Sequence, residues 1–262
     1  MLNKRQVEQY LKRIGFNESL DNTKSMLFGL HQAHMRSVPF ENLDIHLGHK
    51  INLSLPRLFD KIVIKNRGGF CYELNYLFSA LLNVCGFKVN LLSAQVFDGD
   101  VPGREFDHLL LLVECEGVLW ISDVGFGDSF ISPIKLGNQP VEELGYMYKV
   151  TSQDEKQVLF RKKINETWLP QYIFSVIPQN IEAFEEMCEF QQTSSESSFT
   201  KKSVCSIATE SGRLTLSNDK FIETSNGIRS EKLIPSSKVY RQILQQYFCM
   251  RLPDDVSQIQ WN

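Results

Sequence analysis

The apolar residues in the first third of the chain recur at the spacing of α-helices. One run with a period of three to four residues comprises Val7, Tyr10, Leu11 and Ile14. Further helical runs are indicated over residues 23–35, 56–66 and 71–85. Pro56 suits the first turn of its helix, and Gly15 and Gly86 suit the ends of theirs. The pattern therefore predicts an N-terminal helical bundle.

After Gly86 the pattern changes from helices to short strands. Runs rich in Val, Leu, Ile and aromatic residues are separated by turn-forming pieces such as DGDVPG. These runs cover residues 87–97, 108–115, 117–124, 145–152 and 156–163. Consecutive short strands of this kind predict an antiparallel sheet or a small barrel.

The C-terminal part mixes the two patterns. Residues 180–192 are predicted to form a helix capped by Asn180, and the serine-rich residues 193–198 to form a linker. The elements that follow are two strands and a final helix, over residues 213–217, 220–225 and about 238–248. The order of helices, strands and a mixed module predicts an α+β protein in three units. Their expected bounds are 1–86, 87–192 and 193–262.

Composition and charge exclude several classes of protein. The 262 residues are 42% hydrophobic and 23% charged, which argues against disordered and fibrous chains. The formal net charge is −3, and no basic face is visible, so nucleic acid is not an expected partner. No stretch approaches the roughly 18 apolar residues of a membrane helix. The charged, amphipathic N-terminus also differs from a signal peptide. A membrane is therefore not an expected partner either.

The six cysteines are scattered along the chain without a CxxC pair. Without a secretion signal they are expected to be reduced thiols of a cytoplasmic protein. Five of them lie in apolar or mixed runs and are expected to be buried structural thiols: Cys85, Cys115, Cys188, Cys205 and Cys249.

Cys71 differs from the other cysteines because it follows two glycines and opens a predicted helix, in the stretch RGGFCYELN. The positive end of the helix dipole favours a thiolate and is expected to lower the pKa of the thiol. The glycines permit a close backbone approach, which would present the sulfur and the Cys71 N–H to a substrate carbonyl. The alternative is a core thiol, because free cysteine is among the most buried residues.

His108 and Asp123 are the candidates to complete a triad with Cys71. His108 opens an apolar strand, and Asp123 follows the next strand, ahead of a loop that contains the residues GFG. In adjacent antiparallel strands the two could lie side by side, so that the carboxylate fixes the tautomer of the imidazole. Each residue alone also has an ordinary interpretation, as a surface histidine or a turn-forming aspartate. Their joint placement favours a nucleophile, a base and an orienting acid.

The other histidines form two spaced pairs, His31 with His34 and His46 with His49. Such pairs occur in metal sites, but no cysteine spacing completes a zinc pattern. The second pair also lies in a predicted polar loop. No metal is therefore expected.

Arg67 directly precedes the glycine pair. Its guanidinium could pair with Glu41 of the stretch PFEN and tie two loops together behind Cys71. The alternative is a solvated arginine.

These motifs resemble those of the arylamine N-acetyltransferases, in particular the bacterial type. RGGFCYELN resembles the active-cysteine motif of that family, FDHLLLLV its histidine motif and WISDVGFG its aspartate motif. SVPFENLD resembles the N-terminal signature, and YLKRIGF resembles how such chains begin. The pieces cover residues 10–127 in the right order. Beyond about residue 130 the resemblance is one of length and strand content.

The resemblance implies a papain-like cysteine-triad fold, with an N-terminal helical bundle, an antiparallel β-barrel and a C-terminal α/β lid. It implies Cys71, His108 and Asp123 as the catalytic residues. Acetyl-coenzyme A would be the donor, and an arylamine, arylhydrazine or arylhydroxylamine the acceptor. The implied mechanism is a ping-pong cycle through an acetyl-cysteine, with a role in xenobiotic metabolism.

Residues beside the triad are the expected contacts of the two substrates. The aromatic rings that could stack on an acceptor are Phe40, Phe106 and Phe126. Gly125 and Gly127 would let a loop backbone approach the cofactor or the acceptor closely, and they are expected cofactor contacts. In the family, residues just before the histidine border the pocket, which implies Arg104 and Glu105 as further cofactor contacts. The Cys71 N–H is the expected oxyanion donor.

Two rival functions remain open at this point. One is a papain- or transglutaminase-like cysteine hydrolase or amide transferase, and the other is a non-catalytic binder of coenzyme A or aromatic amines. Papain-like peptidases usually carry a glutamine a few residues ahead of the cysteine, and the residues KNRGGF before Cys71 contain none. An intact triad argues against the binder.

Overall fold

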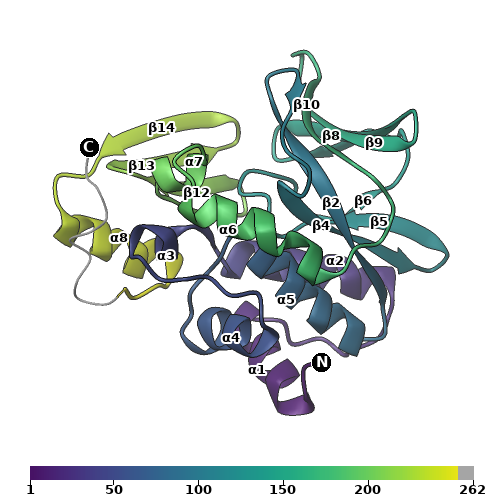
Figure 1. The fold of residues 1–262 in the computed structure, drawn as a ribbon, viewed down its shortest axis with the longest axis horizontal. Coiled ribbons are helices and arrows are strands. Elements are labelled where there is room, and N and C mark those ends of the chain that lie inside the picture. Colours follow the sequence, from purple (N-terminus) through teal and green to yellow (C-terminus); the bar gives the residue numbers. More distant parts are fainter. Residues whose placement is uncertain (253–262) are drawn as a thin grey trace.

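Two antiparallel β-sheets lie side by side above a layer of helices in the computed structural model of the protein, which describes residues 1–252 (Figure 1). The fold is the predicted α+β arrangement of N-terminal helices, a nearly closed antiparallel barrel and a C-terminal mixed module. Within the described residues, no helix is both long and apolar enough to cross a membrane.

The first two helices begin and end as their sequences predict. Helix α1 (Lys4–Ile14) starts at Asn3, whose side chain accepts a hydrogen bond from the backbone of the third residue along. It ends at Gly15, whose φ of 69° lies in the left-handed region that favours glycine. Helix α2 (Lys24–Ser37) is capped in the same way by the side chain of Thr23.

The following helices build the layer beneath the sheets. Helix α3 (Leu43–His46) is a single turn, and α4 (Leu55–Phe59) continues directly into a π-helical turn, η1 (Asp60–Ile64). Helix α5 (Cys71–Val84) begins at the candidate nucleophile and is buried along most of its length. The largest apolar core surrounds this helix. Its position between the other helices and the barrel fixes Cys71 at the centre of the molecule.

The larger sheet forms the barrel, with strand order β6-β5-β4-β2-β10-β9-β8-β7 and with β3 paired to β2. The strands are β2 (Lys88–Asp98), β3 (Val101–Pro102), β4 (His108–Cys115), β5 (Val118–Ser122), β6 (Ile134–Lys135), β7 (Val141–Glu143), β8 (Tyr146–Gln153), β9 (Lys156–Lys163) and β10 (Leu169–Phe174). Neighbouring strands pair antiparallel, and a second apolar core fills the barrel.

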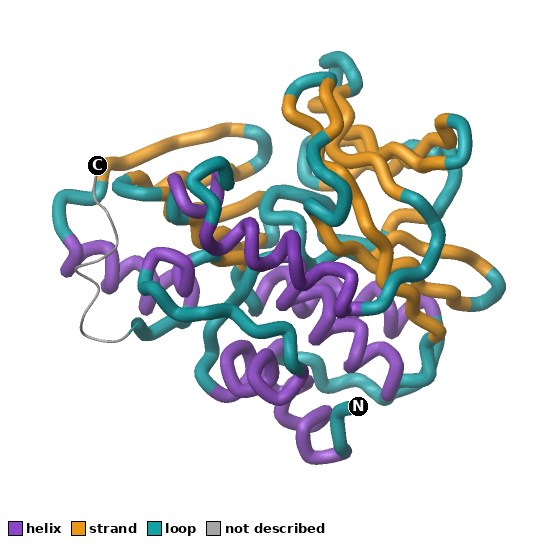
Figure 2. Tube along the Cα trace, viewed as in Figure 1, coloured by secondary structure: helices purple, strands orange, loops and turns teal. Residues whose placement is uncertain are grey.

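The smaller sheet lies beside the larger one (Figure 2) and joins one short strand from the N-terminal part of the chain to four strands of the C-terminal module. Its strands, in spatial order, are β1 (Phe40–Glu41), β11 (Val204–Ala208), β12 (Gly212–Ser217), β13 (Lys220–Ser225) and β14 (Ile228–Leu233). Because β1 pairs with β11, the loop that follows the second helix becomes the edge of the C-terminal sheet. Helix α8 (Ser237–Phe248) packs against this sheet around a third apolar core.

The segment between the sheets differs in detail from the sequence prediction. It forms a 3-10 turn, η2 (Ile181–Phe184), followed by α6 (Glu185–Thr193) and the short α7 (Ser198–Lys201). Asn180 is the N-cap residue of this segment, as expected, but its side chain makes no capping hydrogen bond, and the segment begins as a 3-10 turn. The serine-rich residues form the turn between α6 and α7, where the buried Ser197 hydroxyl accepts a hydrogen bond from the α7 backbone.

Candidate active site

The two glycines before Cys71 are explained by close packing. A Cβ on Gly68 would lie 2.0 Å from the carbonyl oxygen of Pro39, and one on Gly69 would lie 2.8 Å from a carboxylate oxygen of Glu73. Neither glycine has a positive φ, so the backbone conformation does not require them. They allow the chain to pass between the β1 loop and helix α5, which puts Cys71 at the first position of that helix.

His108 and Asp123 lie side by side, as predicted from their places in neighbouring antiparallel strands. Nε2 of His108 is 2.8 Å from Oδ2 of Asp123, and both side chains are almost completely buried. A carboxylate only accepts hydrogen bonds, so Nε2 of the neutral ring carries the proton. Nδ1 is then the nitrogen that can accept a proton.

Asn75 joins these residues to the helix of the nucleophile. It lies one turn after Cys71, and its Nδ2 donates to Oδ1 of Asp123 at 2.9 Å and to the carbonyl oxygen of Leu109 at 2.7 Å. Its Oδ1 accepts the backbone N–H of Val124 at 3.0 Å. One buried amide therefore connects α5 to the strand of His108 and to the loop of Asp123.

The buried environment of Cys71 does not lower the pKa of its thiol. Burial raises that pKa well above its usual value, a hydrogen bond from the backbone of Leu109 opposes the rise, and the carboxylates of Asp123 and Asp107 add to it. The predicted position at a helix start is confirmed, but the expected lowering of the pKa is wrong. Since a buried charge needs a partner, a thiolate at Cys71 requires a cation such as protonated His108.

Asp123 is held in its ionised form. Burial alone would raise its pKa, but attraction to His108 and hydrogen bonds from His108, Asn75 and Gly125 outweigh it, so the pKa lies below its usual value. His31 supports the backbone of this residue, because its Nε2 accepts the Asp123 N–H at 3.1 Å. The ring of Tyr172 packs 5.2 Å from that of His108, centroid to centroid.

The histidine pairs serve the fold. His31 bonds the carbonyl of Ile131 as well as the Asp123 backbone, and His34 bonds the hydroxyl of Tyr10. Burial lowers the pKa of both rings. His46 contacts the amide of Asn42, while His49 is exposed beside Asp44. Among the described residues, no group of three or more ligating side chains could hold a metal ion.

The expected aromatic contacts occupy three different places. Phe126 packs against the His108 ring at a centroid distance of 5.2 Å, and Phe40 lines the large cleft described below. Phe106 instead packs against Phe184, outside the lining of that cleft. Its backbone is left-handed, with a φ of 61°, and its carbonyl accepts the Tyr72 hydroxyl at 2.8 Å. Phe106 thus ties the loop before His108 to helix α5.

The glycines after Asp123 lie where a side chain would not fit. A Cβ on Gly125 would be 2.7 Å from Cα of Cys71, and one on Gly127 would be 2.9 Å from the ring of Phe40. Gly127 also lines the cleft, which Gly125 does not. The loop backbone therefore approaches the nucleophile itself.

Arg104 and Glu105 lie outside the lining of the cleft. Arg104 forms an ion pair with Glu196 at 2.6 Å and stacks over Phe190, and Glu105 pairs with Lys156 at 3.2 Å. Their role as cofactor contacts stays a prediction.

A cleft of about 610 Å³ lies between strands β8–β9 of the barrel and the C-terminal sheet. Five cationic side chains and two acidic ones line it. They are Arg161, Lys163, Lys202, Arg213 and Arg229, with Asp128 and Glu143. Asp128 binds Arg161 at 2.8 Å and approaches Arg213 at 3.6 Å, while no ion pair involves Lys163 or Lys202 within the described residues. An excess of cations suits an anionic ligand such as a phosphate ester.

The other cysteines follow the sequence prediction with one exception. Cys85, Cys115, Cys188 and Cys205 are buried free thiols, as expected. Cys249 is exposed, so its expected burial is wrong. It directly follows α8 with a φ of 53°, and the next residue, Met250, returns to the apolar core.

Three residues near the triad were not identified from the sequence as parts of a site: Asn75, His31 and Tyr172. The signal for Asn75 is a polar residue on the apolar face of a helix, one turn after the cysteine. His31 is also a buried polar residue on a helix, but spacing alone does not reveal its bond to Asp123. Tyr172 lies in a strand that the sequence analysis did not predict.

Comparisons with known proteins agree with this geometry. The N-acetyltransferase family profile matches residues 25–256. The chain is 35% identical over 240 residues to the pineal gland arylamine N-acetyltransferase isozyme NAT-10 of Gallus gallus, covering 83% of each protein.

Solved structures share the fold over nearly the whole chain. The arylamine N-acetyltransferase of Salmonella typhimurium matches with a TM-score of 0.89 and 28% identity, covering 98% of this chain and 94% of its own. The Mycobacterium marinum enzyme, solved in complex with CoA, matches with a TM-score of 0.86 and 26% identity, covering 93% of this chain and 92% of its own. The chain described here therefore belongs to the arylamine N-acetyltransferases, a family of acyltransferases.

Proposed function

We propose that the protein transfers the acetyl group of acetyl-coenzyme A to the nitrogen of arylamines, arylhydrazines or arylhydroxylamines, through an acetyl-Cys71 intermediate. The observation that carries this proposal is the buried contact between Nε2 of His108 and Asp123, followed by a loop in which Gly125 packs against Cα of Cys71 at the start of α5. Asp123 would orient the ring of His108, so that Nδ1 serves as the base for Cys71.

In the first half-reaction the Cys71 thiolate attacks the thioester carbonyl of acetyl-coenzyme A. A carbon–sulfur bond forms to Cys71, and the bond to the coenzyme A sulfur breaks. The leaving thiolate takes the proton that His108 received from Cys71, so free coenzyme A leaves as a thiol. The products are the acetyl-enzyme and a neutral His108.

In the second half-reaction the neutral nitrogen of the acceptor attacks the acetyl-Cys71 carbonyl. His108 takes a proton from that nitrogen, and the Cys71 thiolate leaves. The thiolate and the protonated ring are thereby restored as a pair. Phe126 and Phe40 offer rings against which an aromatic acceptor can pack.

The cleft between the barrel and the C-terminal sheet is the proposed site of the coenzyme A phosphates. Its cations include Lys163 and Lys202, and its lining contains Phe40 and Gly127, which connect it to the loop of Asp123. A homologue of the same fold binds CoA. Phosphates bound at the cations would extend the thioester arm toward Cys71.

Initial velocities with acetyl-coenzyme A and aniline or phenylhydrazine test the proposal. Release of free coenzyme A is measured at several fixed acceptor concentrations. A cycle through an acetyl-enzyme gives parallel lines in double-reciprocal plots. Intersecting lines would contradict the ping-pong route. Hydrolysis of peptides without acetyl transfer would favour the rival cysteine hydrolase.

A further inference from the structure

The backbone N–H groups that lead into helix α5 are occupied one after another, up to the nucleophile. The N–H of Gly68 donates to Oε1 of Glu41 at 3.3 Å, that of Gly69 to the carbonyl of Pro39 at 3.4 Å, and that of Phe70 to Oε2 of Glu73 at 3.1 Å. The next N–H, that of Cys71, has no acceptor among the described residues. It is the first donor in this segment that remains available to a substrate oxygen.

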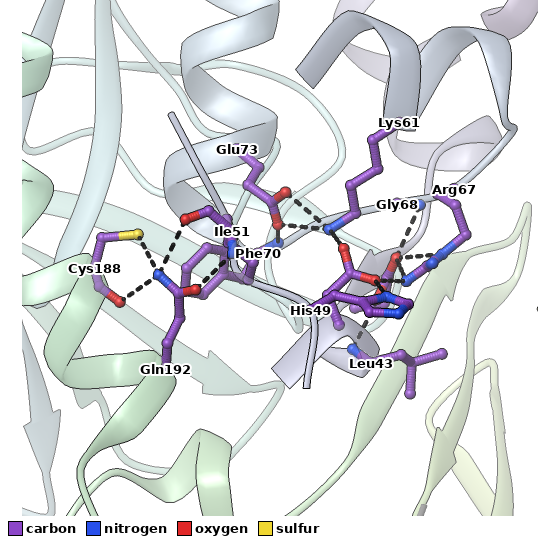
Figure 3. Close-up of polar contacts among 12 residues, drawn as sticks. Leu43, His49, Ile51, Lys61, Arg67, Gly68, Phe70, Glu73, Cys188 and Gln192 are labelled. Atoms are coloured by element: carbon purple, nitrogen blue, oxygen red, sulfur yellow. Dashed lines mark hydrogen bonds and ion pairs between the residues drawn. The ribbon is translucent and has the colours of Figure 1, made fainter. Parts of the chain in front are cut away.

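Glu73 is the third residue of α5, and its carboxylate reaches back over the helix start. Lys61 holds it there, with Nζ 2.8 Å from Oε1 and 3.0 Å from Oε2 (Figure 3). Lys61 lies in the π-helical turn η1, an unusual conformation that is frequent at functional sites. The carboxylate therefore has a fixed position relative to the Phe70 N–H.

The same lysine connects Glu73 to a second group of buried charges. Nζ of Lys61 also lies 2.8 Å from Oδ2 of Asp44, and Oδ1 of Asp44 lies 2.9 Å from Nη2 of Arg67. Arg67 in turn bonds Glu41, with Nε 2.9 Å from Oε1, which confirms the predicted pair. The chain of alternating charges runs from the Glu41 loop to the start of α5.

Lys61 also limits the effect of burial on Glu73. Burial raises the pKa of Glu73, and Lys61, the strongest influence that opposes this rise, limits the pKa to about 7. Lys61 stays charged, because its neighbouring carboxylates outweigh its burial and raise its pKa. Without Lys61 the pKa of Glu73 would rise further, and the side chain would lose the ammonium group that holds it over the helix start.

We propose that Lys61 and Glu73 are positioning residues for Cys71. Lys61 keeps the Glu73 carboxylate on the Phe70 N–H, which fixes the first turn of α5 and leaves the Cys71 N–H directed at the thioester oxygen. The inference deepens the proposed acetyl transfer and rests on it. Neither residue touches substrate, and both act through the backbone of Phe70 and Cys71.

Two reactions of the same thiol separate this role from a structural one. Acetylation by acetyl-coenzyme A forms a tetrahedral oxyanion and needs the N–H donor, whereas alkylation by iodoacetamide displaces iodide and forms none. A change in thiolate fraction alters both rates, while a change in the donor alters acetylation alone. The ratio of acetylation to alkylation rates is therefore the quantity to measure.

The experiment uses Cys249→Ser as the parent, so that the exposed thiol does not react. Lys61→Met and Glu73→Ala are expected to lower the ratio about tenfold, because a displaced Cys71 N–H would stabilise the oxyanion less. Glu73→Gln keeps an oxygen for the Phe70 N–H and is expected to stay within about threefold of the parent. Lys65→Met is the matched control, because Lys65 pairs with Asp60 at the surface of the same turn.

Thermal unfolding of each variant shows whether it is folded at the assay temperature. If Lys61→Met does not fold, the inference is tested by comparing the ratio of acetylation to alkylation rates between Glu73→Ala and Glu73→Gln. Ratios equal to the parent in folded Lys61→Met and Glu73→Ala would overturn the inference. A parent that is alkylated but never acetylated would overturn the proposed function, and this inference with it.

Discussion

Nδ2 of Asn75 lies 2.9 Å from Oδ1 of Asp123, so a side chain of the helix that begins at Cys71 holds the carboxylate proposed as the acid of the triad. His108 binds the other oxygen of the same carboxylate. The two oxygens of Asp123 thus connect α5 and β4, and the proposed catalytic arrangement depends on the packing of the helices against the barrel.

Replacing Asn75 tests this connection. Asn75→Ala removes the partner of a buried carbonyl, a carboxylate oxygen and a backbone N–H. We expect a loss of about 3 kcal/mol in the free energy of unfolding, measured with urea, because buried polar groups lose their partners. Acetyl transfer should also fall. Asn83→Ala is the control on the exposed face of the same helix, and an equal effect there would contradict the account.

The ion pairs of Asp44 predict how stability depends on pH. Burial would raise the pKa of Asp44, but Lys61 and Arg67 outweigh it and lower the pKa to about 2. In the unfolded chain the pKa of an aspartate carboxyl is about 3.9. Between pH 2 and this value, the unfolded chain binds more protons than the folded one. The contribution of Asp44 to the free energy of unfolding is therefore complete above about pH 4 and is lost as the pH falls toward 2.

Urea unfolding of the wild type and Asp44→Asn at several pH values checks this. The stability difference between the two should shrink by about 2 kcal/mol from pH 5 to pH 2. A difference that is the same at every pH would show that the charge of Asp44 contributes nothing.

The cationic cleft predicts a salt-dependent KM for acetyl-coenzyme A. The double variant Lys163→Glu/Lys202→Glu should raise that KM about tenfold or more at low salt, because it replaces two cations of the cleft by anions. The rise should be smaller at high salt, because dissolved ions screen surface charges. The acetylation rate at saturating donor should change little. Lys12→Glu/Lys88→Glu is a control with the same change of net charge outside the cleft lining. An equal rise of KM in the control would contradict the proposed site.

The end of α8 predicts a stabilising substitution. Cys249 has a φ of 53°, a conformation that costs a residue with a side chain more than it costs glycine. Cys249→Gly should raise the free energy of unfolding by about 0.5–1 kcal/mol. Cys249→Ser, which keeps the strain, should not. Loss of stability in the glycine variant would indicate that the thiol contributes a contact.

Local sequence signals were sufficient for the longer helices of the N-terminal part and for the contact between His108 and Asp123. Helix starts and stops are local, as Asn3 and Gly15 illustrate, and strands β4 and β5 are short apolar runs joined by a tight turn. The neighbouring strands bring His108 beside Asp123. The pair of Arg67 and Glu41 was also predictable, because both residues flank the same candidate site.

Long-range pairing and the direction of side chains were not predictable. Strand β1 is two residues long, and its partner β11 is more distant in the chain than any turn signal reaches. Strand β10 contains Pro170 and a bulge, and β14 is exposed along its length, so neither has the pattern of a buried strand. Cys249 ends an apolar run, and only the end of α8 turns it to solvent.

The central claim is an acetyl group on Cys71, and intact-protein mass spectrometry tests it most directly. The wild type is incubated briefly with acetyl-coenzyme A and no acceptor, beside Cys71→Ser and Asp123→Asn. The account predicts one acetyl adduct on the wild type, none on Cys71→Ser, slow formation on Asp123→Asn, and discharge by aniline. No adduct on a wild-type protein whose Cys71 still reacts with iodoacetamide would contradict it.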